Sequence, residues 1–299
     1  MSRTAWILLL TLSLLWGGSY LSARVAAPVL PPFTLVFLRC ALAAVALLVI
    51  LKASGARLGW TRRQVIDYAG MGLLNNVIPF ALIFYGTSQI GAGLASILNA
   101  TTPIFTALVA HAFTSDEKLT ANKTVGVILG FVGVAEMLGL GALADLGGHL
   151  EAELACLAAA VSYAVSTLWG RRFRGQPPMA TAAGQLSLSS LIVLPLMLAA
   201  EAPWTLPMPP GDVAAAVLFL AFGATALAYI LFFRILTLAG SNVMLVTFLV
   251  PVSAILLGVL VLGETLQLRH WVGMGLIMAG LVAIDGRLWR QVSRRFAGA

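Results

Sequence analysis

Apolar positions fill long runs of this 299-residue sequence, and the runs have the length of membrane-crossing helices. No Asp, Glu, Lys or Arg occurs between Asp67 and Asp116, and further charge-free runs follow residues 174, 212 and 234. A helix needs about 20 mostly apolar residues to cross the hydrocarbon layer of a bilayer. The first run therefore has room for two crossings, with a turn at Gln89-Ile90-Gly91-Ala92-Gly93.

The same length rule predicts an all-α integral membrane protein with ten spans and short connections. Residues 1–23 also fit a secretory signal, because Arg3 precedes an apolar stretch that ends in Leu21-Ser22-Ala23. The length of that stretch and the spans that follow it favour a first membrane helix. The predicted spans lie near residues 5–23, 32–51, 68–88, 93–113, 122–141, 152–170, 179–199, 213–234, 242–262 and 270–286.

Charge is scarce and lies mainly on one side of the predicted membrane. Only 10% of the residues are charged, against about a quarter in soluble domains. With ten spans, the loops on the side of both termini hold most Lys and Arg residues, including those after position 286, and the opposite loops hold only Arg24 and Arg269. Cationic loops stay cytoplasmic, so we expect both termini in the cytoplasm. The net charge of +7 then reflects topology and does not indicate a nucleic-acid partner.

The second half of the chain repeats the first. Pro103 has a counterpart in Pro251, and at a spacing of 147 residues the match continues through a short loop and a glycine-bearing span. Five spans per copy is an odd number, so the two copies insert with opposite orientations. We expect an inverted repeat, with residues 1–144 and 145–299 as its units and a substrate site near the membrane midplane between them. The matched pairs after the proline are Glu117 with Glu264, Leu119 with Leu266, Gly126 with Gly273 and Gly133 with Gly280.

Several motifs resemble one family of transporters. LLWGGSY in the first span, FLRCALAA in the second, the block LASILNATTPIFTALVAHAF with DEKLT and GVILGFVGV, and the later copy LVTFLVPVSAILLGVLVLGETL with GMGLIMAGLV are similar to the EamA family of the drug/metabolite transporter superfamily. The resemblance covers residues 5–286. It implies ten helices in two inverted repeats around a central cavity for small metabolites, and it points to bacterial amino-acid exporters similar to YddG.

Polar and aromatic side chains at depth in the spans are the candidate substrate contacts. In the fourth span Ser96 and Asn99 share one helical face with Pro103, and Thr247 and Pro251 follow in its repeat copy. The alternative for these polar groups is hydrogen bonding between helices, with proline acting only as a kink. We favour that alternative for Thr101 and Thr102.

The first span adds Trp16 and Tyr20, whose matching positions in the sixth span are Tyr163 and Thr167, with Ser166 beside them. Aromatic rings with a polar edge suit a cavity that holds an apolar body and a polar head group, although such residues also form interfacial belts.

The third span adds adjacent amides and a proline, Pro79, and the eighth adds Tyr229. Adjacent side chains on a helix point about 100° apart, so one amide at most faces the cavity. We expect Asn76, since Phe80 lies one turn along the same face.

Arg39 and Glu136 are the most awkward charges, because both fall within the outer half of a predicted span. We expect them to pair with each other or to line an outer vestibule, with snorkelling to the interface as the alternative.

The sequence thus predicts an inner-membrane transporter that works by alternating access, most simply an exporter of neutral or zwitterionic amino acids. Export of nucleosides, sugars or drugs is the alternative substrate class, and a channel or membrane enzyme is disfavoured, since the His residues lie at span ends or in loops. Cys40 and Cys156 fall inside spans, and we expect no cofactor, metal site or disulfide. The expected partners are a small molecule and the lipid bilayer, and a monomer is favoured.

Overall fold

A computed structural model describes residues 2–138 and 149–285. The predicted boundary between residues 144 and 145 and the arginines after position 286 lie outside the described residues. Within these ranges the chain is helical and has no strand. Nine of the helical segments described are long and apolar enough to cross a membrane, and α13 is a shorter apolar helix. The fold class predicted from the sequence is confirmed.

The ten spans agree with the predicted positions, and several consist of more than one helical segment. The first repeat contains α1 (Arg3–Ala26), α2 (Pro32–Ala53), α3 (Arg62–Gly72) with η1 (Leu73–Val77) and α4 (Ile78–Ile90), α5 (Ala92–Asn99) with α6 (Thr102–Phe113), and α7 (Ala121–Leu138). The second contains α8 (Leu150–Gly170), η2 (Arg171–Phe173), α9 (Pro178–Glu201), η3 (Pro203–Thr205), α10 (Gly211–Leu218) with η4 (Phe219–Leu227) and α11 (Ala228–Ala239), η5 (Gly240–Leu245) with α12 (Val246–Leu262), and α13 (Leu268–Asp285).

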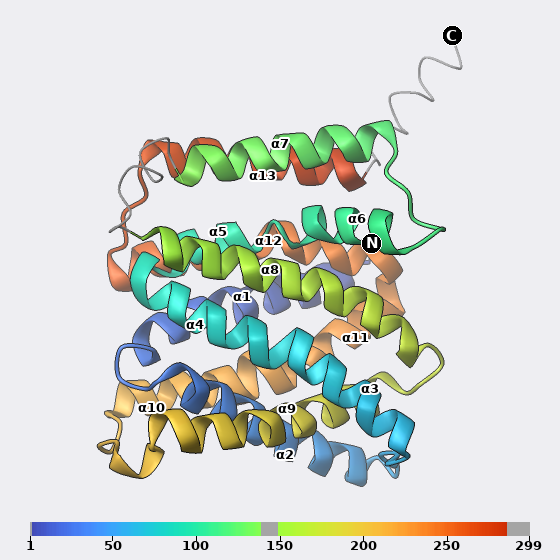
Figure 1. The fold of residues 1–299 in the computed structure, drawn as a ribbon, viewed down its shortest axis with the longest axis vertical. Coiled ribbons are helices and arrows are strands. Elements are labelled where there is room, and N and C mark those ends of the chain that lie inside the picture. The colour runs from blue at the N-terminus through green and yellow to red at the C-terminus, as the bar shows by residue number, and fades with distance from the viewer. Residues whose placement is uncertain (1, 139–148, 286–299) are drawn as a thin grey trace.

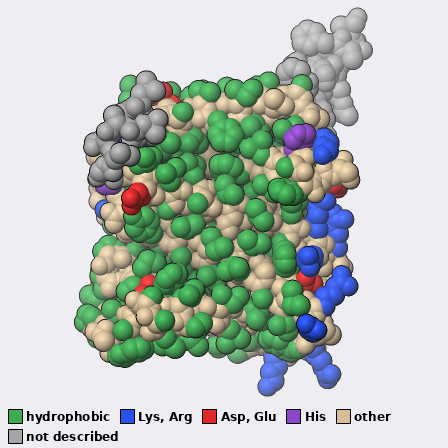
Figure 2. Space-filling model, viewed as in Figure 1, with side chains coloured by type: hydrophobic (Ala, Val, Ile, Leu, Met, Phe, Trp, Pro, Cys, Tyr) green, Lys and Arg blue, Asp and Glu red, His purple; other side chains and the backbone are tan. Residues whose placement is uncertain are grey.

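The helices run roughly side by side across the molecule, with α7 and α13 along one edge and α2 and α9 along the other (Figure 1). The remaining spans lie between these two pairs. The start of α1 and the end of α13 lie at the same end of the bundle. Lys and Arg side chains gather at that end, and apolar side chains cover most of the surface between the ends (Figure 2). We call it the cationic end, and we call the other the Glu264 end, after a residue described below.

The pairing of α7 with α13 shows the two-fold relation between the repeats at the level of single residues. A Cβ atom on Gly126 would lie 2.5 Å from the carbonyl oxygen of Gly280, and one on Gly133 would lie 2.7 Å from that of Gly273. Gly126 matches Gly273, and Gly133 matches Gly280, so exchanging the repeats exchanges the two contacts. This reciprocity defines a two-fold interface. The glycines also allow the backbones to approach closely, as in other membrane helix pairs.

Local signals in the sequence explain where the spans begin and turn. Thr61 and Gln64 form a capping box that starts α3 before the predicted beginning of the third span. Pro32 and Pro178 each occupy a first helical position, where the missing N–H costs nothing. Gly91 makes the predicted turn between α4 and α5 with a φ of 85°, which a residue with a side chain rarely adopts.

One helical irregularity was not predicted, and it occurs once in each repeat. The third span contains the π-helical segment η1, and the eighth span contains the longer π-helical segment η4 at the equivalent place. A π-turn inserts one residue per turn and changes which side chains face a neighbour, and such turns often occur at functional sites. Both segments lie beside the central cavity.

Candidate functional site

A cavity of about 650 Å³ lies between the repeats and opens at one end of the bundle. The residues that line it come from α1 to α6, α8, α9, α11 and α12, and from η1, η2, η4 and η5. At the cationic end the lining continues out to Gly170, Arg174 and Pro178 in the connection between α8 and α9. Toward the opposite end it stops at Tyr20, Arg39 and Phe84. The cavity is therefore accessible from the cationic end and closed at the Glu264 end.

Most of the predicted substrate contacts lie in the wall of this cavity. Asn76 does not, and Pro103 is also absent from the wall, whereas Pro251 is part of it. The cavity also has wall residues that were not predicted from the sequence, and Gln185 is the clearest of them. The sequence could have indicated Gln185, because it is the one amide side chain in the apolar seventh span. The predicted residues in the wall are Trp16, Tyr20, Phe80, Ser96, Asn99, Tyr163, Ser166, Tyr229 and Thr247.

The expectation that Asn76 faces the cavity is wrong, and its neighbour Asn75 takes that position. Asn76 is fully buried and donates a hydrogen bond from Nδ2 to Ser189 Oγ at 2.9 Å. The prediction assumed an α-helix, in which residues 76 and 80 share a face. The π-helical η1 instead places Asn75 on the face of Phe80, five residues later.

A hydrogen-bond network joins four spans around the Tyr229 hydroxyl. Asn75 Nδ2 donates to the Tyr229 Oη at 3.1 Å, and Gln185 Nε2 donates to the same oxygen at 2.8 Å. Ser166 Oγ in turn contacts Asn75 Oδ1 at 3.1 Å. Within the described residues the buried Oε1 of Gln185 has no hydrogen-bond donor. Polar groups from both repeats are thus gathered at one wall of the cavity.

The fourth span breaks where the polar residues interrupt it. α5 ends at Asn99 and α6 begins at Thr102, so Pro103 lies in the first turn of a new helix. Thr102 Oγ1 donates to Asn99 O at 2.7 Å, and Thr101 Oγ1 donates to Leu98 O at 2.6 Å, which also accepts the Thr101 N–H. These bonds lie within the fourth span, so they are not the contacts between helices that we favoured for the two threonines, and Thr102 also lines the cavity.

The break also positions the Asn99 side chain, whose Nδ2 donates to Tyr20 Oη at 2.8 Å across the cavity wall. The other two prolines lie in different settings. Pro79 starts α4 directly after η1, whereas Pro251 lies inside the continuous helix α12.

Arg39 lies at the closed end of the cavity and does not pair with Glu136. Its Nε donates to Thr225 Oγ1 at 2.8 Å, and its guanidinium carbon lies 3.7 Å from the centre of the Phe80 ring. Glu136 is exposed on α7, at the edge of the bundle opposite α2 (Figure 1). The expected pair is therefore wrong, because the sequence gives depth along a helix but does not give the direction in which each side chain points.

Two polar side chains, Glu264 and Arg24, join neighbouring segments at the closed end of the bundle. Glu264, in the connection before α13, accepts hydrogen bonds from the backbone N–H groups of Ala92 at 2.8 Å and Gly93 at 3.0 Å. It thereby caps the N-terminus of α5, where a negative charge is stabilised by the exposed N–H groups. At the same end the guanidinium of Arg24 donates to the carbonyl oxygen of Ser88 and joins α1 to α4.

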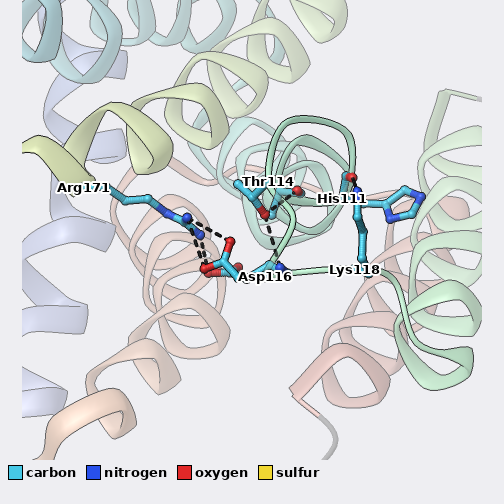
Figure 3. A network of polar contacts seen from close by, with 7 residues as sticks. His111, Thr114, Asp116, Lys118 and Arg171 are labelled. Carbon is cyan, nitrogen blue, oxygen red and sulfur yellow. Dashed lines mark hydrogen bonds and ion pairs between the residues drawn. The ribbon is translucent and has the colours of Figure 1, made fainter.

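The matching glutamate at the cationic end makes a different contact. Glu117 accepts a hydrogen bond from Arg171 at 2.6 Å, and Asp116 accepts one from the same guanidinium at 3.1 Å (Figure 3). The hydrogen bond from Arg171 is the main cause that lowers the pKa of the exposed Asp116 carboxyl. Nearby, Lys118 Nζ donates to His111 O at 2.8 Å. Arg171 directly follows α8, so these contacts tie the loop before α7 to that helix.

Comparisons with known proteins agree with this architecture. The chain is 27% identical to the "Uncharacterized inner membrane transporter YedA" of Escherichia coli over 92% of its own length and 89% of that protein. It is 25% identical to the "Uncharacterized transporter YoaV" of Bacillus subtilis, with 91% and 94% of the two chains covered. A crystal structure with 21% sequence identity superposes with a TM-score of 0.67 and covers 95% of this chain and 98% of its own, so it shares the fold.

The EamA-like transporter family matches residues 3–139 and 150–284, one match on each repeat. This match covers nearly the whole chain, and the names of the relatives agree with a membrane transporter. The protein belongs to the EamA-like transporter family.

Proposed function

We propose that this protein exports amino acids across the bacterial inner membrane by alternating access, with the cationic end in the cytoplasm. The observation that carries the proposal is a cavity between two inverted repeats that is open at one end only. Two nearly equivalent packings of inverted repeats open one site to either side in turn. The structure would then represent the inward-facing state, since Lys and Arg gather at the open end and cationic loops stay in the cytoplasm.

The two matched glutamates support a switch between such packings. Glu264 caps α5 at the closed end, while Glu117 binds Arg171 at the open end. In the exchanged packing, Glu117 would cap the start of the ninth span at η5, and Glu264 would be released. Gly240 begins η5 and has a positive φ after α11, as Gly91 has after α4. The capped end is the closed end in each state, because the cap ties a loop to the N-terminus of a helix that lines the cavity.

The cavity wall supports a substrate with both polar and apolar parts. Aromatic rings of Trp16, Tyr163 and Phe80 provide apolar surface, and amides provide hydrogen bonds. The amide oxygens Asn99 Oδ1 and Gln185 Oε1 are buried without a donor in the described part of the chain. Buried acceptors of this kind suit a substrate that brings N–H donors, as an amino group does.

Flux through purified protein in liposomes tests the proposal. Vesicles loaded with an unlabelled compound are diluted into the same compound in radiolabelled form, with amino acids, nucleosides and sugars compared in the presence and absence of a pH gradient. A carrier gives saturable counterflow, whereas a channel does not. Saturable counterflow of amino acids is the expected result. Counterflow restricted to nucleosides or sugars would contradict the substrate class, and unsaturable flux would contradict alternating access.

Two substitutions test whether the described cavity is the transport site. Trp16→Ala and Asn99→Ala each remove a wall residue, and we expect a lower counterflow rate with nearly unchanged yield and unfolding temperature of the purified protein. Trp6→Ala is the matched control, because Trp6 lies exposed on α1 and outside the cavity wall. Wild-type rates in both wall variants would contradict the assignment of this cavity.

A further inference from the structure

The guanidinium of Arg39 is a buried positive charge without an acidic partner in the described part of the chain. Arg39 is only 7% exposed, and it takes part in none of the ion pairs among the described residues. Among the described residues, no Asp or Glu lines the cavity. Burial of a charge is unfavourable unless a counter-charge or several hydrogen bonds accompany it. A charge kept in this state at the end of a transport cavity indicates that the missing partner is brought by the ligand.

The contacts of Arg39 leave one edge of the guanidinium for such a partner. Thr225 Oγ1 accepts the hydrogen bond from the Arg39 Nε–H group. The Thr225 hydroxyl in turn donates to Leu220 O at 2.7 Å within η4, which fixes its orientation. The ring of Phe80 covers one flat face. The two terminal nitrogens, Nη1 and Nη2, have no hydrogen-bond acceptor among the described residues. These nitrogens form the end of the planar fork, which binds a carboxylate through two parallel hydrogen bonds.

We infer that the cavity binds its substrate through a carboxylate, which forms an end-on, two-bond pair with Arg39 at the closed end. The inference rests on the proposed transport function and names the chemical group that the site selects. The remainder of the substrate extends toward the open end, past the aromatic wall of Trp16 and Tyr163. Arg39 thereby determines the specificity of the cavity for acids, a role that differs from the ion pair or outer-vestibule position expected from the sequence.

A carboxylate fits this site better than other charged groups do. Arg39 is the one buried cation in the described lining, and Arg174 lies exposed at the opening, so a single negative charge is matched at the closed end. A doubly charged phosphate would retain an uncompensated charge there. An organic cation without an acid would meet the like charge of Arg39, with no carboxylate in the described wall to offset it. An amino acid fits, since its carboxylate pairs with Arg39 and its amino group meets amide oxygens.

Matched compounds that differ only in the acid group test the inference. The purified full-length protein is titrated in detergent with L-phenylalanine, 3-phenylpropanoate, L-phenylalaninamide and 2-phenylethylamine, and with L-leucine and L-leucinamide, while its unfolding temperature is recorded. The same compounds are then compared in counterflow. We expect each acid to bind at least about tenfold more tightly than its amide, since hydrogen bonds between charged groups are the strong ones. The amine binds most weakly.

Three variants assign the preference to Arg39. In Arg39→Gln the difference in affinity between acid and amide disappears while the amide binds as before, which loss of a merely structural residue would not produce. Arg39→Lys keeps the charge but loses the planar fork, and we expect an intermediate preference. Arg234→Gln removes an exposed arginine of α11 outside the cavity wall and keeps the wild-type preference. Arg39→Gln should also unfold at the same or a higher temperature without ligand, because a buried unpaired charge has been removed.

The outcomes separate this inference from the proposed function. An amide or amine that binds the wild-type protein as tightly as its acid overturns the carboxylate assignment, as does an Arg39→Gln variant that still prefers acids. The assignment is also wrong if no acid of the panel binds. Saturable amino-acid counterflow without a preference for acids over amides would overturn the carboxylate assignment alone and leave amino-acid export standing. Counterflow restricted to a nucleoside or a sugar would contradict the amino-acid substrate as well.

Discussion

Glu264 and Glu117 occupy matching positions in the two repeats, yet one caps a helix and the other binds an arginine. Glu264 accepts two backbone N–H groups at the start of α5, and Glu117 contacts Arg171 at the opposite end of the bundle. The α7 and α13 pair, in contrast, repeats its glycine-to-carbonyl contacts in both halves of the interface. The two repeats are thus alike along α7 and α13 and differ at the two ends of the bundle, where the proposed exchange between two packings would take place. The cavity opens at the end whose glutamate does not cap.

The largest expected effect follows from removing the cap at the closed end. Glu264→Gln keeps an acceptor but loses the charge, and hydrogen bonds to a charged group contribute about 1.5–3 kcal/mol. The ratio of the open to the closed form at this end should rise roughly tenfold or more. Spin labels on cysteines placed at the exposed Gln89 and Thr265, after Cys40→Ala and Cys156→Ala, report the distance across this end. We expect a new long-distance population and slower counterflow.

The label pair without the Glu264 substitution is the reference for this measurement. An unchanged distance distribution in Glu264→Gln would mean that the cap does not hold the end closed. The glutamate would then only stabilise the start of α5, and the comparison between the two ends would lose its functional meaning.

The second prediction tests the symmetric region, where matched substitutions should cost similar amounts. Gly133→Ala and Gly280→Ala each place a Cβ against a partner backbone, 2.7 Å from Gly273 O and 2.6 Å from Gly126 O. Overpacking of this kind destabilises by about 1–3 kcal/mol. We expect decreases of similar size in the unfolding temperature of the two variants, since each Cβ meets a glycine carbonyl of the partner helix. Gly275→Ala on α13 meets no atom within 4 Å and serves as the control. Unequal losses would show that the two-fold relation is only approximate there.

The sequence was sufficient for the scaffold because hydropathy and glycine spacing act over whole spans. Long apolar runs require helices, and the matched glycines of α7 and α13 require close backbone approach, so fold and symmetry follow. The direction of single side chains did not follow. The π-helical η1 exchanges Asn75 for Asn76 at the cavity, and only backbone geometry reveals it. Arg39 was placed at the correct depth, but its contact with Thr225 depends on how α2 is rotated against η4.

A smaller effect, opposite in sign to the first, is expected at the open end. Glu117→Gln removes an exposed ion pair from the observed state, where such pairs contribute about 0–1 kcal/mol. In the exchanged state the same change would remove a helix cap, which is typically worth about 0.5–2 kcal/mol. The balance should shift roughly threefold toward the observed state. The label pair at Gln89 and Thr265 would then show a smaller long-distance population than in the protein without this substitution. In the double variant Glu264→Gln with Glu117→Gln, that population should lie between those of the two single variants. A shift in the same direction as Glu264→Gln contradicts the reciprocal arrangement.

The smallest effect concerns the exposed loop that holds Glu117 in its present place. The Arg171 hydrogen bond lowers the pKa of Asp116 below its ordinary value of about 3.9, so the folded protein holds the Asp116 proton less tightly than the unfolded chain does. The resulting stabilisation is present at neutral pH and is lost only as the pH falls through the lowered pKa. A spin label at the exposed Ser115 should therefore keep the same mobility from pH 8 to 5 and gain mobility only in stronger acid. Asp116→Asn should raise the mobility slightly at neutral pH and remove the acid step. A step in label mobility near pH 6 in the wild type would mean that a different titrating group controls the mobility of the loop. The Asp116 contact with Arg171 would then not be what keeps the loop in place.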